Sequence, residues 1–221
     1  MSNMKPKFIV LCGGDGSGKS TILEQIKKKY AGTKNSKKGP KILQTREPGG
    51  SPYAENIRKI MFKDPLSKNA DSKTMFGLFW AARADHMSRL ILPALAGGSH
   101  VISDRFDCCT YAYQIYAQQN GELKNLFWKV REFFLKERTP DLYIFLDVHV
   151  EEGMRRAGKR KRNKNHFDDR DIAFHTAVRR GYMDFIKEVH LRDGKSLVID
   201  ANQPLKKVCE DVMEVVDSML K

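Results

Sequence analysis

Near its N-terminus the sequence reads Gly13-Gly14-Asp15-Gly16-Ser17-Gly18-Lys19-Ser20, which fits the phosphate-loop pattern G-x-x-x-x-G-K-[S/T] at every fixed position. The apolar run before it, residues 8–12, is typical of a buried strand, and residues 21–27 have the spacing of an amphipathic helix. Glycines let successive backbone N–H groups point at phosphate oxygens, and a helix N-terminus also favours anions. We therefore predict that this loop, continued to Thr21, binds the phosphates of ATP.

Two side chains of the loop have distinct expected roles. Lys19 is predicted to reach the β- and γ-phosphates, and the Ser20 hydroxyl is predicted to ligate Mg²⁺. The alternative is a chance glycine-rich turn between a strand and a helix, which the eight matching residues and their flanks disfavour.

The composition limits the class of protein. With 221 residues the chain is long enough to bury a substantial core, and we expect a single domain over residues 1–221. No apolar stretch approaches the length of a membrane span and the N-terminal run is too short for a signal peptide, so a cytoplasmic protein is expected. The cysteines have no metal-site spacing, and we expect reduced thiols packed as small apolar residues at positions 12, 108, 109 and 209.

The formal net charge of +13 leaves three explanations open: nucleic-acid binding, binding of polyanionic small molecules, or a basic surface without a specific partner. Because aromatic residues do not alternate with the basic ones and the arginines follow the predicted strands, a nucleic-acid partner is not the expected one.

Apolar, strand-like runs alternate with helical patterns along the chain. This alternation predicts βαβ units, and so a three-layer α/β/α fold of the P-loop NTPase type around a five-stranded parallel sheet. Ligands of such sheets bind beyond the carboxyl ends of the strands. The expected strands are residues 8–12, 41–45, 100–103, 141–147 and 196–200; the expected helices are 21–27, 53–62, 73–96, 111–119, 123–136, 151–157, 171–191 and 205–220.

Two arginines follow predicted strands. Arg46 lies in Thr45-Arg46-Glu47-Pro48-Gly49-Gly50, and Arg105 lies in Asp104-Arg105-Phe106. Their planar guanidinium groups suit a second anion, such as an acceptor monophosphate facing the triphosphate, although a structural Arg–Asp pair is the alternative for either one alone. Asp104 is placed to act near Mg²⁺. Asp147, at the end of another strand, is expected to cap the next helix.

In these segments the chain resembles thymidylate kinases, a family of P-loop nucleoside monophosphate kinases, in order through most of its length. The matching segments are residues 13–21, 45–50, 79–83 with His86 and Pro93, 104–106 and 112–114, and the hexapeptide at 45–50 is the most specific of them. The resemblance implies a single nucleoside monophosphate kinase domain and a homodimer formed through helices that flank the active site.

The resemblance also implies roles for individual residues. Asp15 is similar to the family's acidic contact to the sugar 3′-hydroxyl, and Arg46 and Arg105 would orient the acceptor phosphate. Phe79 would stack on the pyrimidine ring, with a core residue as the alternative, and Arg83 would hydrogen-bond the base edge. The remaining residues implied at the base and sugar are Thr110, Tyr113 and Gln114.

Residues 155–164 are strongly basic and follow the strand that ends at Asp147. Their position predicts a short basic lid, about residues 153–170, although a solvated surface is the ordinary explanation of such a run. Part of the family has an arginine in the phosphate loop where this chain has Gly16. The resemblance therefore implies a lid arginine for charge stabilisation, Arg156 or Arg160, with Arg170 at the far end of the lid.

Taken together, the expected activity is Mg²⁺-dependent transfer of the ATP γ-phosphoryl group to dTMP, giving dTDP and ADP for dTTP biosynthesis. Two alternatives stay open: a nucleoside monophosphate kinase with a different or broader base preference, such as dUMP or other deoxynucleotides, and an ATP-switched nucleic-acid-binding protein.

Overall fold

A parallel five-stranded sheet forms the centre of the described part of the chain. The computed structural model describes residues 5–30, 40–136, 138–158, 170–192 and 194–220. The strands are β1 (Phe8–Gly13), β2 (Ile42–Arg46), β3 (His100–Asp104), β4 (Leu142–Asp147) and β5 (Ser196–Asp200), in the spatial order β2-β3-β1-β4-β5. The strand order reverses around β1, so the carboxyl end of β1 is where a ligand is expected to bind. The predicted α/β class and parallel sheet are confirmed.

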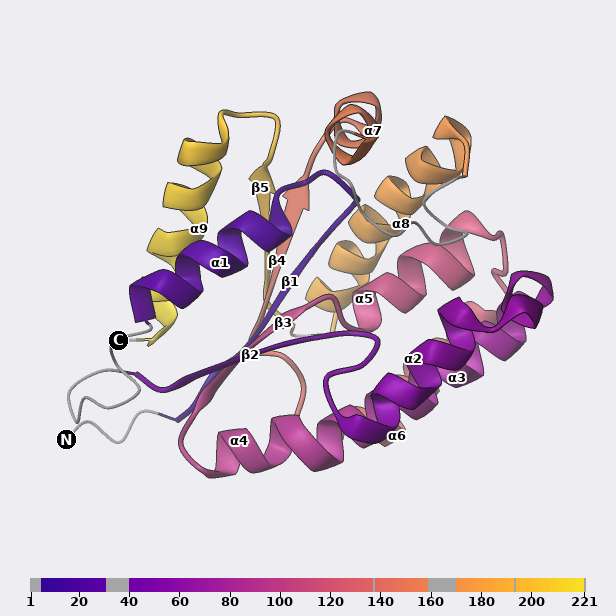
Figure 1. Cartoon of the computed structure of the whole chain (residues 1–221), viewed down its shortest axis with the longest axis horizontal. Helices are drawn as coiled ribbons and strands as arrows, with labels where there is room; N and C mark the ends of the chain where they lie inside the picture. Colours follow the sequence, from indigo (N-terminus) through magenta and orange to yellow (C-terminus); the bar gives the residue numbers. More distant parts are fainter. Residues whose placement is uncertain (1–4, 31–39, 137, 159–169, 193, 221) are drawn as a thin grey trace.

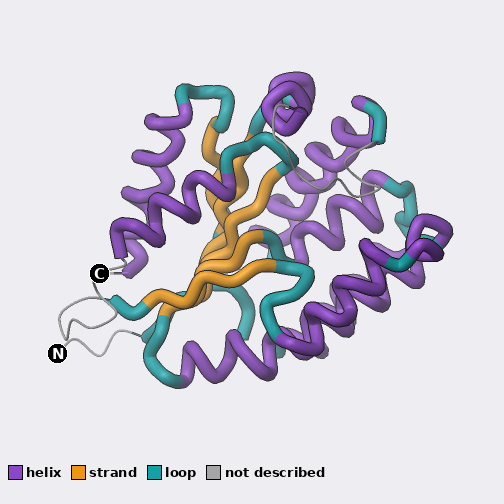
Figure 2. The backbone as a smooth tube through the Cα atoms, in the orientation of Figure 1, coloured by secondary structure: helices purple, strands orange, loops and turns teal. Residues whose placement is uncertain are grey.

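Helices cover both faces of this sheet (Figures 1 and 2). Helices α1 and α9 lie on one face, and the other helices that pack on the sheet lie on the opposite face. The α-helices are α1 (Lys19–Tyr30), α2 (Pro52–Lys63), α3 (Ser72–His86), α4 (Leu92–Ala96), α5 (Asp107–Thr110), α6 (Leu123–Leu135), α7 (Val150–Gly158), α8 (Ile172–His190) and α9 (Leu205–Leu220); η2 (Pro65–Asn69) is a 3₁₀-helix, and η3 (Met87–Ile91) and η4 (Tyr111–Ala117) are π-helices. None of the described helices combines the length and apolar character that crossing a membrane requires.

The helix expected over residues 73–96 is interrupted by the π-helical turn η3. Pro93 at the start of α4 has no backbone N–H, so the carbonyl one turn earlier cannot receive the usual hydrogen bond, and the proline ring crowds it. The helix relaxes into a wider turn just before the proline. The helix expected over 111–119 is likewise π-helical in η4 and follows the short helix α5.

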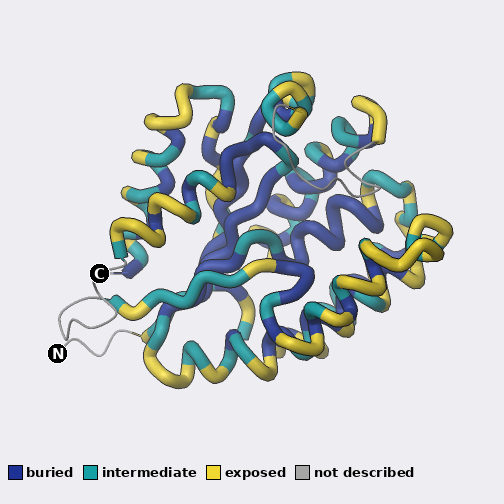
Figure 3. The backbone as a smooth tube through the Cα atoms, in the orientation of Figure 1, coloured by how far each residue is buried: buried dark blue, intermediate teal, exposed yellow. Residues whose placement is uncertain are grey.

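The side chains of strand β1 alternate between two hydrophobic cores, one on each face of the sheet. Phe8, Val10 and Cys12 join the core on the side of α3, α6 and α8, whereas Ile9 and Leu11 join the core beneath α1 and α9. Successive side chains of a strand point to opposite faces, so one buried strand supplies both cores. Figure 3 shows the central strands and the inner helix faces as the buried part. The four cysteines are unpaired, as expected, and three of them are buried.

Helix α8 packs closely on η4 at Gly181. A Cβ atom at this position would lie 2.7 Å from Tyr116 Cβ and 2.9 Å from Ala112 Cα, closer than packed carbon atoms allow. The absence of a side chain therefore sets the distance between α8 and the π-helix that carries Tyr113 and Gln114.

We expect Gly181→Ala to lower the free energy of unfolding by about 1–3 kcal/mol, because the new methyl group overpacks this contact. Gly77→Ala is the matched control, since Gly77 is exposed in α3 and a Cβ there meets nothing within 4 Å. That substitution is expected to stabilise the helix by about 0.5–1 kcal/mol. Urea denaturation measures both; equal stabilities of the two variants would contradict the packing argument.

Candidate active site

The loop between β1 and α1 has the backbone that a phosphate-binding turn requires. Gly16 adopts φ +76°, a conformation that L side chains rarely adopt, and a Cβ there would lie 2.0 Å from the Gly153 carbonyl oxygen of α7. The first turn of α7 therefore packs directly against the phosphate loop. Within the phosphate loop, the buried residues are Gly13, Gly16, Ser17, Gly18 and Lys19, and the partly buried ones are Gly14, Asp15 and Thr21.

Lys19 is held inside the loop. Its Nζ donates to the carbonyl oxygens of Gly13 at 2.8 Å and Gly14 at 2.9 Å, and the residue is only 7% exposed. Burial, with the nearby positive charge of Arg105, lowers the pKa of this ammonium group. The next side chain, Ser20, is exposed at the first turn of α1.

Arg105 connects the turn after β3 to the phosphate loop. Its Nη2 lies 2.9 Å from Asp15 Oδ1, and its guanidinium carbon lies 5.8 Å from the centre of the Tyr113 ring. Arg105 itself has φ +68°, which is strained for a residue with a side chain. Its N–H donates to Leu11 O at 2.9 Å, and its carbonyl accepts from the Ser103 hydroxyl at 2.8 Å, so both ends of the residue are fixed.

Arg46 and Asp104 are brought to the same edge by strand pairing. They are register partners at the carboxyl ends of β2 and β3. Arg46 bonds Glu55 of α2 at 2.8 Å and the Pro48 carbonyl at 3.1 Å, and 46% of its side chain is exposed. The Oδ1 atom of Asp104 is buried and finds no hydrogen-bond partner among the described residues.

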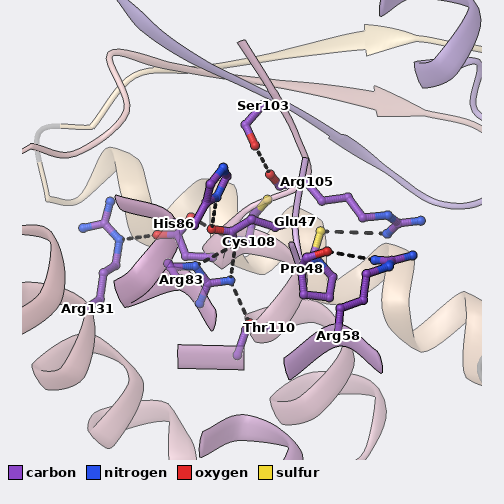
Figure 4. Close-up of polar contacts among 12 residues, drawn as sticks. Glu47, Pro48, Arg58, Arg83, His86, Ser103, Arg105, Cys108, Thr110 and Arg131 are labelled. Atoms are coloured by element: carbon purple, nitrogen blue, oxygen red, sulfur yellow. Dashed lines mark hydrogen bonds and ion pairs between the residues drawn. The ribbon is translucent and has the colours of Figure 1, made fainter. Parts of the chain in front are cut away.

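The segment after β2 builds a buried polar network that the sequence did not reveal (Figure 4). Glu47 pairs with Arg83 at 2.8 Å and with His86 Nδ1 at 3.2 Å, and the other ring nitrogen of His86 lies 2.7 Å from Thr45 Oγ1. Arg83 Nη2 also donates to Thr110 Oγ1 at 3.2 Å. The only sequence signal for Glu47 was its place inside the hexapeptide at 45–50.

Apart from Asp15, the residues predicted at the base and sugar are buried. Phe79 is 8% exposed and Tyr113 7%, and both belong to the same hydrophobic cluster, so Phe79 also has the core surroundings that the alternative explanation required. Gln114 is fully buried, and neither atom of its side-chain amide finds a partner among the described residues; the same holds for Arg83 Nη1. Desolvated donors and acceptors without partners are costly, and a bound ligand is one way to satisfy them.

The residues expected near the lid fall in two groups. Arg156 lies on α7, where it bonds Glu152 at 2.6 Å and the Ala201 carbonyl after β5 at 2.8 Å. Arg170 stacks on Phe174, with 4.7 Å from its guanidinium carbon to the ring centre. Arg160 and most of the predicted lid lie outside the described residues. The predicted roles of all these site residues stay predictions.

Asp147 does not cap the helix that follows it, so that prediction is wrong. Helix α7 begins only at Val150, and the Asp147 carboxylate instead forms a two-bonded ion pair with Arg179 of α8, at 2.5 and 2.7 Å. This pair lines a cavity of about 200 Å³ between the outer side of the phosphate loop, α7 and α8.

Known proteins of one family match most of this chain. The family model described as thymidylate kinase matches residues 12–212. A thymidylate kinase of Staphylococcus haemolyticus is 36% identical over 97% of this chain and 98% of its own length, and one of Bacillus mycoides is 33% identical over 98% of this chain and its whole length. The crystal structure of the Ehrlichia chaffeensis thymidylate kinase superposes with a TM-score of 0.73 at 26% identity, covering 97% of this chain and 99% of that one. The chain belongs to the thymidylate kinase family.

Proposed function

We propose that this kinase transfers the γ-phosphoryl group of ATP to dTMP, giving dTDP and ADP for dTTP biosynthesis. The observation that carries the proposal is the contact of Arg105 with Asp15, which places the arginine expected to hold the acceptor phosphate directly beside the loop expected to hold the donor phosphates. Two anion-binding elements that touch are suited to phosphoryl transfer between two bound phosphates.

The base-side residues support a pyrimidine acceptor. Arg83 Nη1 and the amide of Gln114 are buried polar atoms without partners in the described chain, and Phe79 provides an aromatic surface in the same region. A base that offers both carbonyl and N–H groups satisfies a guanidinium donor and a side-chain amide together. Purely apolar packing would leave these groups unpaired.

The chain's own residues supply orientation and charge. Lys19 exchanges its bonds to the Gly13 and Gly14 carbonyls for bonds to the donor phosphates, and Arg105 and Arg46 hold the acceptor phosphate in line. The lid arginines, Arg156 or Arg160, add positive charge where negative charge spreads over the transferred group. No covalent intermediate with the protein is required.

Mg²⁺ fits two oxygen-bearing side chains, that of Asp104 at the end of β3 and that of Ser20 at the first turn of α1. The buried Asp104 Oδ1, which has no partner among the described residues, and the exposed Ser20 hydroxyl are the oxygen ligands that this ion prefers. Asp104 and Ser20 would hold the ion, directly or through water, and the ion would neutralise phosphate charge.

A panel of monophosphates tests the base preference. We expect catalytic efficiency to be highest with dTMP, lower with dUMP and much lower with dCMP and purine deoxynucleotides. A preference for another acceptor would support the broader-specificity alternative. Tight, salt-sensitive oligonucleotide binding without phosphorylation of any monophosphate would support the nucleic-acid alternative, which the family membership does not favour.

We expect Lys19→Ala to lower kcat by at least about a hundredfold, because the substitution removes a preorganised cation from the transferring phosphates. Lys28→Ala is the matched control, since Lys28 lies on the same helix but is 65% exposed in a pair with Glu24. A coupled ADP assay measures both. Near-normal turnover by the Lys19 variant would overturn the assignment of this lysine.

Arg105→Ala is expected to raise KM for dTMP by about a hundredfold while KM for ATP changes far less, because the lost guanidinium serves the acceptor. Arg89→Ala, which removes an arginine that is 70% exposed, is the control. Equal changes in both KM values would show that Arg105 serves the whole site rather than the acceptor alone.

We also infer a homodimer, on the basis of helix α6. Leu126, Val130, Phe133 and Phe134 recur at the spacing of one helix face, and this face lies beside the one that packs into the core. Phe133 is 70% exposed, and Phe134 stacks on Trp80 of α3 at 5.8 Å. An apolar stripe of this kind is suited to pack against a second copy of the chain.

Sedimentation velocity tests the dimer. The mass obtained for the wild-type protein is expected to be twice that of one chain. The mass obtained for Phe133→Asp is expected to be that of one chain, because dimerisation of this variant would bury a charge in the interface. Leu191→Asp, at a residue 80% exposed just after α8, is expected to stay dimeric. A monomeric wild-type protein would refute the inference.

A further inference from the structure

Glu47 is a buried carboxylate in a site that has to bind anions. It lies directly after β2, is 5% exposed, and contacts two other buried side chains, Arg83 at 1% exposure and His86 at 0%. A buried negative charge is costly unless buried partners compensate it, and Arg83 and His86 are such partners here. We propose that Glu47 is a positioning residue that fixes Arg83 in one orientation and thereby sets the base preference of the proposed dTMP kinase activity, on which this inference rests.

The hydrogen bonds of Arg83 leave one part of its guanidinium available. Glu47 Oε2 accepts from Nε at 2.9 Å and lies 2.8 Å from Nη2, and Nη2 also donates to Thr110 Oγ1 at 3.2 Å. The two N–H groups of Nη1 remain without a partner in the described chain. The pair with Glu47 thus determines which nitrogen is presented to a ligand.

Aromatic rings restrict the same guanidinium further. Its central carbon lies 4.5 Å from the centre of the Trp80 ring and 5.1 Å from that of Phe106. Stacking of this kind favours a fixed plane for the guanidinium, while the carboxylate fixes its rotation within that plane.

Glu47 is itself held by its second oxygen. Oε1 lies 3.2 Å from His86 Nδ1, and His86 Nε2 lies 2.7 Å from Thr45 Oγ1. A Cβ at Gly50 would lie 2.4 Å from His86 Nε2, so the imidazole is also confined by the backbone of the same segment. Thr45, Glu47 and Gly50 together form a rigid support for Arg83.

The chemistry of the presented nitrogen leads to a specific preference. A guanidinium donates hydrogen bonds and accepts none, so Nη1 pairs with a ring carbonyl but not with an amino group. dTMP carries a carbonyl on the pyrimidine ring where dCMP carries an amino group. In a desolvated site a mismatched polar pair is strongly rejected, provided that the donor cannot turn away.

The test compares dTMP with dCMP, both as kcat/KM and as dissociation constants from calorimetric titration. Glu47→Gln keeps the shape of the side chain but removes its charge and one acceptor oxygen, and we expect the dTMP-to-dCMP ratio to fall at least about tenfold, mainly through KM for dTMP. Glu122→Gln removes an exposed carboxylate paired with Lys73 and is expected to leave the ratio within about twofold of wild type.

Two further variants separate positioning from a merely structural role. Glu47→Asp keeps the charge, so it covers the case in which Glu47→Gln does not fold; it withdraws the carboxylate by one methylene, and we expect the ratio to fall at least about threefold. If Glu47 acts through Arg83, adding Glu47→Gln to Arg83→Gln changes the ratio by less than about twofold.

Three results would overturn the inference: an unchanged ratio in the folded Glu47 variants, an equal loss of dTMP and dCMP use, or an undiminished effect of Glu47→Gln in the Arg83→Gln background. Failure of the proposed function gives a different result, because it appears in the wild type as an absence of dTMP phosphorylation. The titrations of the two nucleotides still report whether Glu47 sets the preference in that case.

Discussion

The ion pair between Arg105 and Asp15 is the contact that connects the predicted acceptor side of the site with the phosphate loop. It joins the turn after β3 to the loop after β1, and it exists because these strands are neighbours whose carboxyl ends meet at one edge. Arg105 adopts a strained backbone conformation to reach it, held by bonds to Leu11 and from Ser103. Strain that the surrounding structure maintains is typical of a functional position.

Two further cations of the predicted site are buried before any nucleotide binds. Lys19 and Arg83 are nearly fully buried, and each cation is stabilised by fixed oxygens: loop carbonyls for Lys19 and the Glu47 carboxylate for Arg83. Burial, with the nearby charge of Arg105, lowers the pKa of Lys19 and so disfavours its charged form. The phosphates of the proposed reaction would relieve that cost, so folding would supply part of the driving force for binding them.

The strands, the phosphate loop and the residues at the strand ends were predictable because they depend on local patterns and on the rule that ligands bind at the carboxyl edge. The partners of these charged side chains were not predictable. Glu47 and Arg83 are 36 positions apart in the sequence, and Asp147 and Arg179 are 32 apart. Both pairs therefore depend on how α3 and α8 pack against the ends of the strands, which the spacing of residues in the sequence does not reveal. The π-helical turns also depend on packing, except that Pro93 gave a local reason for η3. The single-domain organisation, the site roles and the cytoplasmic location stay predictions.

The contact between α7 and the phosphate loop links two features that the sequence presents separately. The Gly153 carbonyl oxygen lies where a side chain at position 16 would begin, 2.0 Å from a Cβ there, so α7 in this position excludes an arginine from the loop. The same close approach brings Arg156, one turn further along α7, to the carboxyl edge of the sheet, where it bonds the Ala201 carbonyl. The glycine at position 16 and the position of Arg156 on α7 are therefore consequences of one packing arrangement. A glycine at position 16 is what lets α7 approach the loop this closely, as the proposed role of Arg156 in charge stabilisation requires.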